Sequence, residues 1–222
     1  MFDSEVQERP AEDWLSLDSD FGAAKDDAKG LLAQKYGARG LAFDVDRYSS
    51  TLQTDDIVCT ARENGFIVGT MTVRFDREQP LNADQIFAAE LNQWRRAGVK
   101  LCEFGRLAVD RRALEPKQLL ARIFHLGYLH AHRREGFDRL VIEVNPRHVA
   151  FYRRWLGLLP HTTPRHNPSV NAPAVLMSLH FQHVRSQIAR WGGQPSAMAS
   201  ARSLYPLAWG PAEEAAMLAR LA

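Results

Sequence analysis

The sequence predicts a mixed α/β domain in which helices flank a central sheet with both antiparallel and parallel strands. Two β-branched runs, residues 57–62 and 67–75, are separated by Glu63, Asn64 and Gly65. Asn-Gly between such runs is the strongest short signal for a hairpin. Further along, two strand-type runs alternate with two helical stretches, and this order makes the two strands parallel neighbours joined by a crossover helix.

The chain has 222 residues, of which 45% are hydrophobic, and this suffices for one sizeable domain. We expect residues 25–193 to form it, after a loosely ordered leader at 1–24 and before a linker and C-terminal helix at 194–222. The net charge of +2 is too small to indicate nucleic-acid binding. We find no run of about 18 apolar residues and no signal-peptide core near Met1, so we expect a soluble, cytoplasmic protein.

The first element that we predict is a helix from Lys25, with a stop at Gly37 and apolar residues at helical spacing. A loop at 38–50 should then wrap the sheet. Gly69, inside the second hairpin strand, indicates a bulge or the close approach of another group. The apolar positions of the helix are Ala28, Leu31, Leu32 and Tyr36.

After Pro80 the spacing predicts a second amphipathic helix, capped by Asn82 and ended by Gly98. A strand from Lys100 to Asp110 follows, and then a helix from Lys117 to Gly136. The buried stripe of the first of these helices is expected at Phe87, Leu91 and Trp94, and that of the second at Leu120, Ile123, Phe124 and Gly127.

The second parallel strand, DRLVIEV, ends at the segment NPRHVAFYRRWLG. In that segment Asn145 can cap a helix, Pro146 suits its first turn, and Gly157 ends it. A stiff, proline-rich loop leads to the apolar strand APAVLMSLHF and to the helix HVRSQIARW. We read GGQPSAMAS as a linker before the terminal helix.

Cysteines and histidines do not form a metal-binding pattern. Cys59 and Cys102 lie inside predicted strands without further ligands at metal spacing, so we expect small core residues. His125, His130 and His132 do not share one helical face. We therefore predict no metal site.

Glu103 and Arg106 interrupt an apolar strand, where polar groups are costly to bury. They form either a structural pair or part of a functional site. Positive charge gathers in the same half of the chain, since residues 106–154 hold eleven Lys and Arg against five Asp and Glu. This charge is either a solvated face or a docking surface for an acidic partner.

Several segments, in order, resemble the FeeM-like long-chain N-acyl amino acid synthases, which have the GCN5-related N-acyltransferase (GNAT) fold. The likeness runs from roughly Lys25 to Gly193. It implies that the two central parallel strands splay apart and admit an acyl thioester, which reacts with the α-amine of an amino acid. The matching segments are CEFGRLAVD, ARIFHLGYLHA, IEVNPRHVAFY, NAPAVLMSL and QIARWGG.

The resemblance also bears on the acyl donor. Coenzyme A enzymes of this fold have a glycine-rich turn that cradles the pyrophosphate, but RRALEPKQLL at that place has no glycine. The FeeM-like relatives take acyl-phosphopantetheine thioesters from acyl carrier protein, so we expect this partner, no bound cofactor, and retain acyl-coenzyme A as an alternative. The residues expected to meet the acidic carrier are Arg111, Arg112, Lys117 and Arg122.

Chemistry at the site requires a proton acceptor, because the amine is mostly protonated at neutral pH. Glu103 is the candidate, and Arg106 would either clamp the acceptor carboxylate or balance Glu103. Leu107, Ala108 and Val109 are expected to bind substrate, with backbone amides around Ala108 and Val109 holding the thioester oxygen. A Cys102 acyl-enzyme is a weaker mechanism, because no base is tied to it by sequence.

Tyr152 stands seven residues after Asn145, where many enzymes of this fold carry a proton donor for the departing thiolate. It is otherwise a core aromatic residue. Asn145 would bond pantetheine or merely cap its helix, and Arg147 and His148 would line the substrate pocket. The predicted acyl tunnel is formed by Val58, Phe66, Ile123 and Phe124.

Three alternatives stay open at this level. An acyl-homoserine lactone synthase of the same fold would need an adenosylmethionine pocket, for which we identify no residues. An acetyl-coenzyme-A-dependent N-acetyltransferase is the second. The third is a non-catalytic protein that binds or senses acyl chains.

Overall fold

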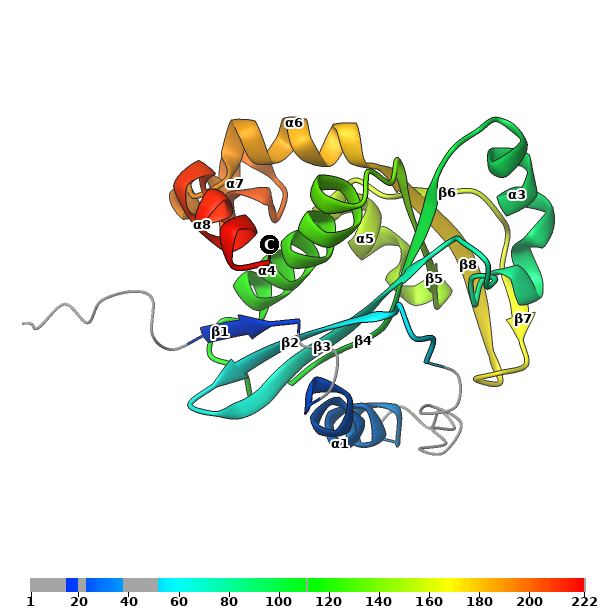
Figure 1. Ribbon diagram of the computed structural model, residues 1–222, viewed down its shortest axis with the longest axis horizontal. Helices are drawn as coiled ribbons and strands as arrows, with labels where there is room; N and C mark the ends of the chain where they lie inside the picture. The colour runs from blue at the N-terminus through cyan, green and yellow to red at the C-terminus, as the bar shows by residue number, and fades with distance from the viewer. Residues whose placement is uncertain (1–14, 20–22, 38–51, 111, 222) are drawn as a thin grey trace, which may run out of the picture.

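A computed structural model describes residues 15–19, 23–37, 52–110 and 112–221, and a twisted sheet forms its centre (Figure 1). The strands follow the order β1-β2-β3-β4-β5-β8-β6, and β7 pairs with β8. All neighbours are antiparallel except β4 and β5, which are parallel. The strands are β1 Leu15–Asp18, β2 Ile57–Glu63, β3 Phe66–Phe75, β4 Leu101–Val109, β5 Arg139–Val144, β6 Leu159–Pro160, β7 Arg165–Asn167 and β8 Ala172–His180.

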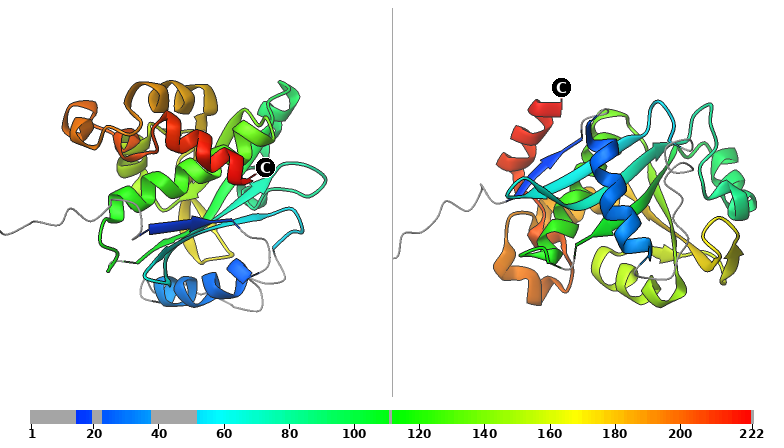
Figure 2. Two further views of the ribbon diagram at one scale, coloured as in Figure 1. Left: turned by 60° about the vertical axis from the view of Figure 1, so that its left-hand side comes forward. Right: turned by 90° about the horizontal axis from the view of Figure 1, so that it is seen from below.

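Helices cover both faces of this sheet, as Figures 1 and 2 show. On one face α4 and α6 pack against Cys102, Phe104 and Leu140, together with α5. On the other, α3 packs against Leu101 and Val141, and α1 packs against β2 and β4. The helices are α1 Ala23–Gly37, α3 Asp84–Arg96, α4 Pro116–Tyr128, α5 Val149–Leu156, α6 Phe181–Trp191, α7 Met198–Ala201 and α8 Pro211–Leu221, with shorter helical segments η1 Leu129–Arg134, η2 Pro146–His148, η3 Pro195–Ala197 and η4 Tyr205–Leu207.

The predicted hairpin is confirmed. β2 and β3 pair across Asn64 and Gly65, whose φ angles of 50° and 82° are those of a tight primed turn. A β-bulge lies between Ala61 and Arg62, beside Gly69. A Cβ at Gly69 would lie 2.6 Å from Cδ2 of Leu119 on α4, so both reasons proposed for this glycine apply.

The two parallel strands part after a short paired stretch. Pairing between β4 and β5 ends at Glu103 and Val141, although both strands continue. Between the pairs Thr72–Gly105 and Thr70–Ala108, β4 contains one residue more than β3, which is a bulge. The bulge residue Arg106 has a φ of +52°. The bulge bends β4 away from β5, and the result is the predicted splay.

Both ends of the chain differ from the expectation. Within the predicted leader, Leu15–Asp18 forms β1 and pairs with β2, so a strand and not a helix is the first described element. The predicted linker is folded as η3 and α7. Its glycine, proline and serine content suggested a linker, but the next apolar residues bury themselves against α4. The predicted loop at 38–50 lies outside the described residues.

Candidate active site

Glu103 lies where β4 and β5 separate. Its carboxylate points to the α3 face of the sheet, where it accepts the backbone N–H of Ala83 at 3.3 Å and the side-chain N–H of Asn82 at 3.4 Å. Only 4% of Glu103 is exposed. Asn82 was predicted to cap α3, but the cap position belongs to Ala83, and Asn82 serves this carboxylate instead.

Arg74 completes the surroundings of Glu103. Its guanidinium donates to the buried Asp56 at 2.7 and 3.0 Å and to Oδ1 of Asn82 at 2.9 Å. Burial raises the pKa of Glu103, while the hydrogen bonds from Ala83 and Asn82 and the charge of Arg74 act in the opposite direction. Because Asp56 balances much of the charge of Arg74, Glu103 remains suited to take up a proton.

Glu143 on β5 is a second, half-buried carboxylate that the sequence analysis missed. It lies two residues beyond Val141, the pairing partner of Glu103, so both side chains share the α3 face. Its carboxylate accepts the side-chain N–H of Asn167 at 2.6 Å. Burial raises the pKa of Glu143 to about 7, and the negative charge of Glu103 adds to this shift. The signal in the sequence was the same as for Glu103: one acid inside the apolar strand LVIEV.

Backbone amides of β4 face the gap beyond Glu103. The N–H of Asp110 donates to the carbonyl of Val68 on β3 at 2.7 Å. Because successive N–H groups of a strand point to opposite sides, the N–H of Val109 points away from β3. Ala108 donates toward Thr70 by the same alternation. Leu107 and Arg106 are half-buried at the bulge.

Across the gap, the segment NPRHVAFY forms η2, capped by Asn145, and the first half of α5. The side chain of Asn145 accepts the backbone N–H of Arg147 at 3.2 Å, which confirms it as a cap. Arg147 is exposed, and its Nε donates to Nε2 of His148 at 3.2 Å. Tyr152 is half-buried, with its ring centroid 6.3 Å from that of Phe124. Tyr152 packs on the α4 face, opposite to the face of Glu103.

The basic residues predicted to meet a carrier protein have different surroundings. Arg112 is exposed and pairs with Asp110 at 2.9 Å. Lys117 is also exposed, with its Nζ 5.4 Å from the ring centroid of Trp155. Arg122 differs, because only 15% of its side chain is exposed and it faces Glu213 of α8 at 3.6 Å. Arg122 therefore contacts the C-terminal helix and does not contribute to an outward-facing surface. Arg111 lies outside the described residues.

The loop between β4 and α4 is already engaged by carboxylates of this chain. Glu63 is buried and accepts the N–H of Leu114 at 3.2 Å with each of its oxygens. Asp110 accepts the N–H of Arg112 at 3.0 Å. These amides precede α4, where a helix start would favour a bound phosphate. Two negative side chains occupy that position instead.

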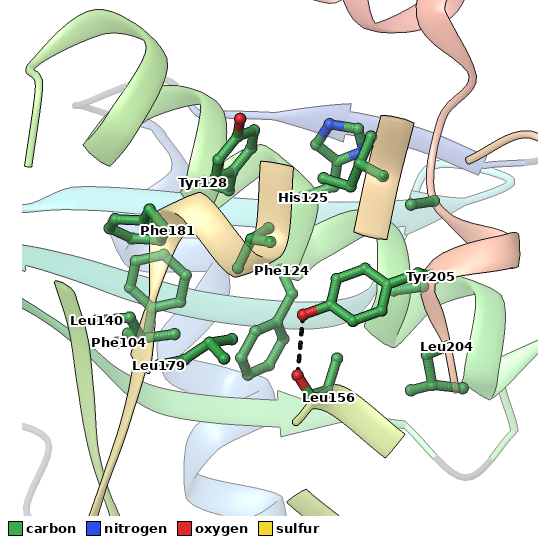
Figure 3. A pocket seen from close by; sticks show the side chains of 14 residues that line it. Phe104, Phe124, His125, Tyr128, Leu140, Leu156, Leu179, Phe181, Leu204 and Tyr205 are labelled. Atoms are coloured by element: carbon green, nitrogen blue, oxygen red, sulfur yellow. Dashed lines mark hydrogen bonds between the residues drawn. The ribbon is translucent and has the colours of Figure 1, made fainter. Parts of the chain in front are cut away.

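On the α4 face, an apolar cavity lies beside Phe104, the first residue of β4 beyond the paired stretch (Figure 3). Of the predicted tunnel residues, Phe124 lines it. Val58 packs against α1 on the other face, Ile123 is buried without lining the cavity, and Phe66 is 77% exposed beside the hairpin turn. The cavity wall comprises Phe104, Ala121, Phe124, His125, Tyr128, Leu140, Leu156, Leu179, Phe181, Val184, Ile188, Leu204, Tyr205 and Ala208.

Both cysteines are free and fully buried, as predicted for core residues. Burial raises the pKa of the Cys102 thiol well above its usual range, which disfavours the thiolate that an acyl-enzyme would require. Among the described residues, no group of three His, Cys, Asp or Glu side chains is placed to hold a metal ion. Within the same part of the chain, no helix has the length and apolar character needed to span a membrane.

Comparison with known proteins places this geometry in a family. Residues 27–180 match the family described as N-acyl amino acid synthase FeeM. The structure of FeeM from uncultured soil microbes is similar at 27% identity and a TM-score of 0.69, over 78% of this chain and 93% of that one. No curated protein sequence matches the chain.

Two further solved structures share the fold. A putative N-acetyltransferase from Lactobacillus plantarum is 16% identical, with a TM-score of 0.53 over 76% of this chain and 99% of its own. The AHL synthase LasI is 14% identical, with a TM-score of 0.53 over 75% and 89%. The chain is an N-acyltransferase of the GNAT fold and belongs to the FeeM family of N-acyl amino acid synthases.

Proposed function

We propose that this enzyme transfers a long acyl chain from the phosphopantetheine thioester of acyl carrier protein to the α-amine of an amino acid. The observation that carries the proposal is the arrangement around the gap between β4 and β5. The buried Glu103 and the half-buried Glu143 lie on one face of the sheet there, and an apolar cavity lies on the other. Pockets that bind apolar ligands are lined mostly by hydrophobic and aromatic side chains, as this cavity is.

The amino acid approaches Glu103 from the α3 face. Glu103 takes a proton from its ammonium group, and the free amine attacks the carbonyl carbon of the thioester. A C–N bond forms as the C–S bond breaks, and the nitrogen loses a second proton, which balances the proton that the departing thiolate gains. Glu143 favours a state in which the two carboxylates share one proton near neutral pH, because the negative charge of each one disfavours ionisation of the other.

The thioester oxygen becomes negative during the attack, and the N–H of Val109 is the donor proposed to hold it. We had expected the amides around both Ala108 and Val109 to hold this oxygen. We now propose only that of Val109, because the N–H of Ala108 is directed to β3. Tyr152 is proposed to protonate the departing thiolate from the α5 side. We also propose that substrate is contacted around the gap by Arg106, Leu107, Asn145, Arg147 and His148.

The loop between β4 and α4 supports acyl carrier protein over coenzyme A as the proposed acyl donor. In that loop, Glu63 and Asp110 occupy the amides that a coenzyme A pyrophosphate would need, and their charge would repel it. A phosphopantetheine arm brings a single phosphate. The carrier itself is acidic, and it would meet the exposed Arg112 and Lys117 at the mouth of the gap.

The test is mass spectrometry of lipid extracts from a host that expresses the protein, since an accumulated N-acyl amino acid identifies acceptor and chain length together. The purified enzyme is then assayed with matched acyl-carrier-protein and acyl-coenzyme A thioesters. An extract identical to the empty-vector control, and no turnover with either donor, would contradict the proposal and favour a protein that only binds acyl chains. Faster turnover with the coenzyme A donor would contradict the choice of carrier.

A further inference from the structure

The last part of the chain, residues 192–221, folds back over α4 and is here named the C-terminal strap. It lies beyond the residues that match the FeeM family. In Figure 2 its final helix, α8, runs alongside α4. The ion pair between Glu213 and Arg122 and the pair between Glu214 and Arg133 confirm this contact.

Backbone and side-chain hydrogen bonds fasten the middle of the strap to α4 and α5. The N–H of Trp209 donates to Nδ1 of His125 at 3.2 Å. The hydroxyl of Tyr205 donates to the carbonyl of Leu156 at 2.8 Å, as Figure 3 shows, and the N–H of Leu204 donates to the carbonyl of Trp155 at 2.9 Å. These bonds hold η4 at fixed positions on two helices.

His125 also touches the strap through its other ring nitrogen. Nε2 lies 3.3 Å from a carboxylate oxygen of Glu214. Since Nδ1 accepts the N–H of Trp209, the proton of a neutral imidazole is on Nε2, the ring nitrogen that lies near Glu214. Burial lowers the pKa of His125, in agreement with a neutral ring. The strap is thus fastened on both sides of a histidine that lines the cavity.

Three strap residues, Leu204, Tyr205 and Ala208, form one wall of the apolar cavity. The opposite wall is formed by the sheet, at Phe104 and Leu140. Leu204 and Ala208 are 1% and 4% exposed, so the wall is closed to solvent. A chain that enters beside Phe104 therefore meets the strap at the far side.

We propose that the C-terminal strap is the end wall of the acyl cavity and sets the length of the acyl chain that the enzyme accepts. This inference rests on the proposed function for its substrate, but the wall is defined by the cavity itself. Each methylene that enters the cavity strengthens binding roughly fourfold, until the chain reaches the wall. Beyond that point, a longer chain must displace packed side chains.

Two variants move the wall in opposite directions. Leu204→Ala should lengthen the preferred chain by about two methylenes, and Ala208→Leu should shorten it by a similar amount. Leu207→Ala is the matched control, because Leu207 packs against the core from the same segment without lining the cavity. Leu204→Val and Ala208→Val repeat both shifts with smaller changes in volume, in case the first variants do not fold.

Two readouts separate this inference from the proposed function. Mass spectrometry gives the chain lengths of products in the expressing host, and calorimetry with free fatty acids of increasing length gives the binding cutoff of the purified protein. The inference is supported if the chain-length cutoff shifts in opposite directions in the Leu204 and Ala208 variants and does not shift in Leu207→Ala. This result supports the role of the strap as the end wall even if no N-acyl amino acid forms. An unchanged cutoff in folded Leu204 and Ala208 variants would overturn it, even if the enzyme makes N-acyl amino acids.

Discussion

The two faces of the sheet differ sharply at the point where β4 and β5 part. The α3 face holds the buried Glu103, the buried Arg74–Asp56 pair and the half-buried Glu143, all of them supported by asparagines. The α4 face holds an apolar cavity lined by aromatic and aliphatic side chains. One strand pair therefore separates a region of polar, ionisable side chains from a region of apolar ones.

The alternation of a β-strand explains how adjacent residues serve such different regions. Glu103 faces α3, while its neighbours Cys102 and Phe104 face α4. The bulge at Arg106 then changes the twist of β4 and opens the gap between the faces. If the proposed roles of the two faces hold, we expect that changes on the α3 face alter catalysis and acceptor binding without altering acyl-chain binding on the α4 face.

The largest effect is expected for Glu103→Gln. Removing the proton acceptor should lower kcat by about 10²–10⁴-fold, because general base catalysis typically contributes that much. Glutamine keeps the size of the side chain and can still accept the N–H of Ala83, so the melting temperature should change little. Fatty-acid binding on the α4 face should be unchanged. A normal kcat in this variant would show that Glu103 is not the proton acceptor.

The second prediction concerns Glu143 and the pH dependence of stability. Its pKa is raised from 4.5 to about 7 in the folded protein, so the folded state binds more protons than the unfolded state between those values. The free energy of unfolding should therefore fall as pH rises through this window, by about 3 kcal/mol for this group. Glu143→Gln should flatten the slope in denaturant titrations. The exposed Glu78→Gln is the control, and an equal slope in both variants would contradict the assignment.

Local sequence patterns were enough to predict most of the helices, strands and turns of the fold. The Asn64–Gly65 turn, the cap at Asn145 and the strand that contains Glu103 are each encoded by residues close together in the chain. The order of strands and helices predicted the parallel pair, because right-handed crossovers leave few alternatives. These features depend little on how distant segments meet.

The positions of the other site residues depend on which residues of neighbouring strands pair, and the sequence alone does not reveal this register. Placing Glu143 beside Glu103 requires the pairing of Glu103 with Val141. Asn82 was a plausible cap until the neighbouring carboxylate was located. Val58 and Phe66 were assigned to the tunnel without knowing which face or end of the hairpin they occupy. The family likeness identified the chemistry but not the strap that closes the cavity.

The third prediction tests the donor side. Tyr152→Phe should reduce kcat by roughly tenfold, because the thiolate must then leave without a proton donor. A donor thioester whose thiol is more acidic needs less help and should recover most of the lost rate. The ring packing against Phe124 is preserved in this variant. A loss that is equal for both thioesters would show that Tyr152 acts by packing alone.

The smallest effect is expected at the mouth of the gap, where charges act on encounter more than on chemistry. Arg112→Glu and Lys117→Glu should each lower kcat/KM for acyl carrier protein by about fivefold at low salt, with kcat unchanged. The loss should shrink as ionic strength rises, because exposed charges are screened beyond about 10 Å at 0.1 M salt. Arg96→Glu on α3 changes the charge by the same amount on the opposite face and serves as control. If all three variants lose activity alike, net charge and not a docking surface steers the carrier. If only Lys117 and Arg112 matter, the donor approaches over the loop in which Glu63 and Asp110 already occupy the amides.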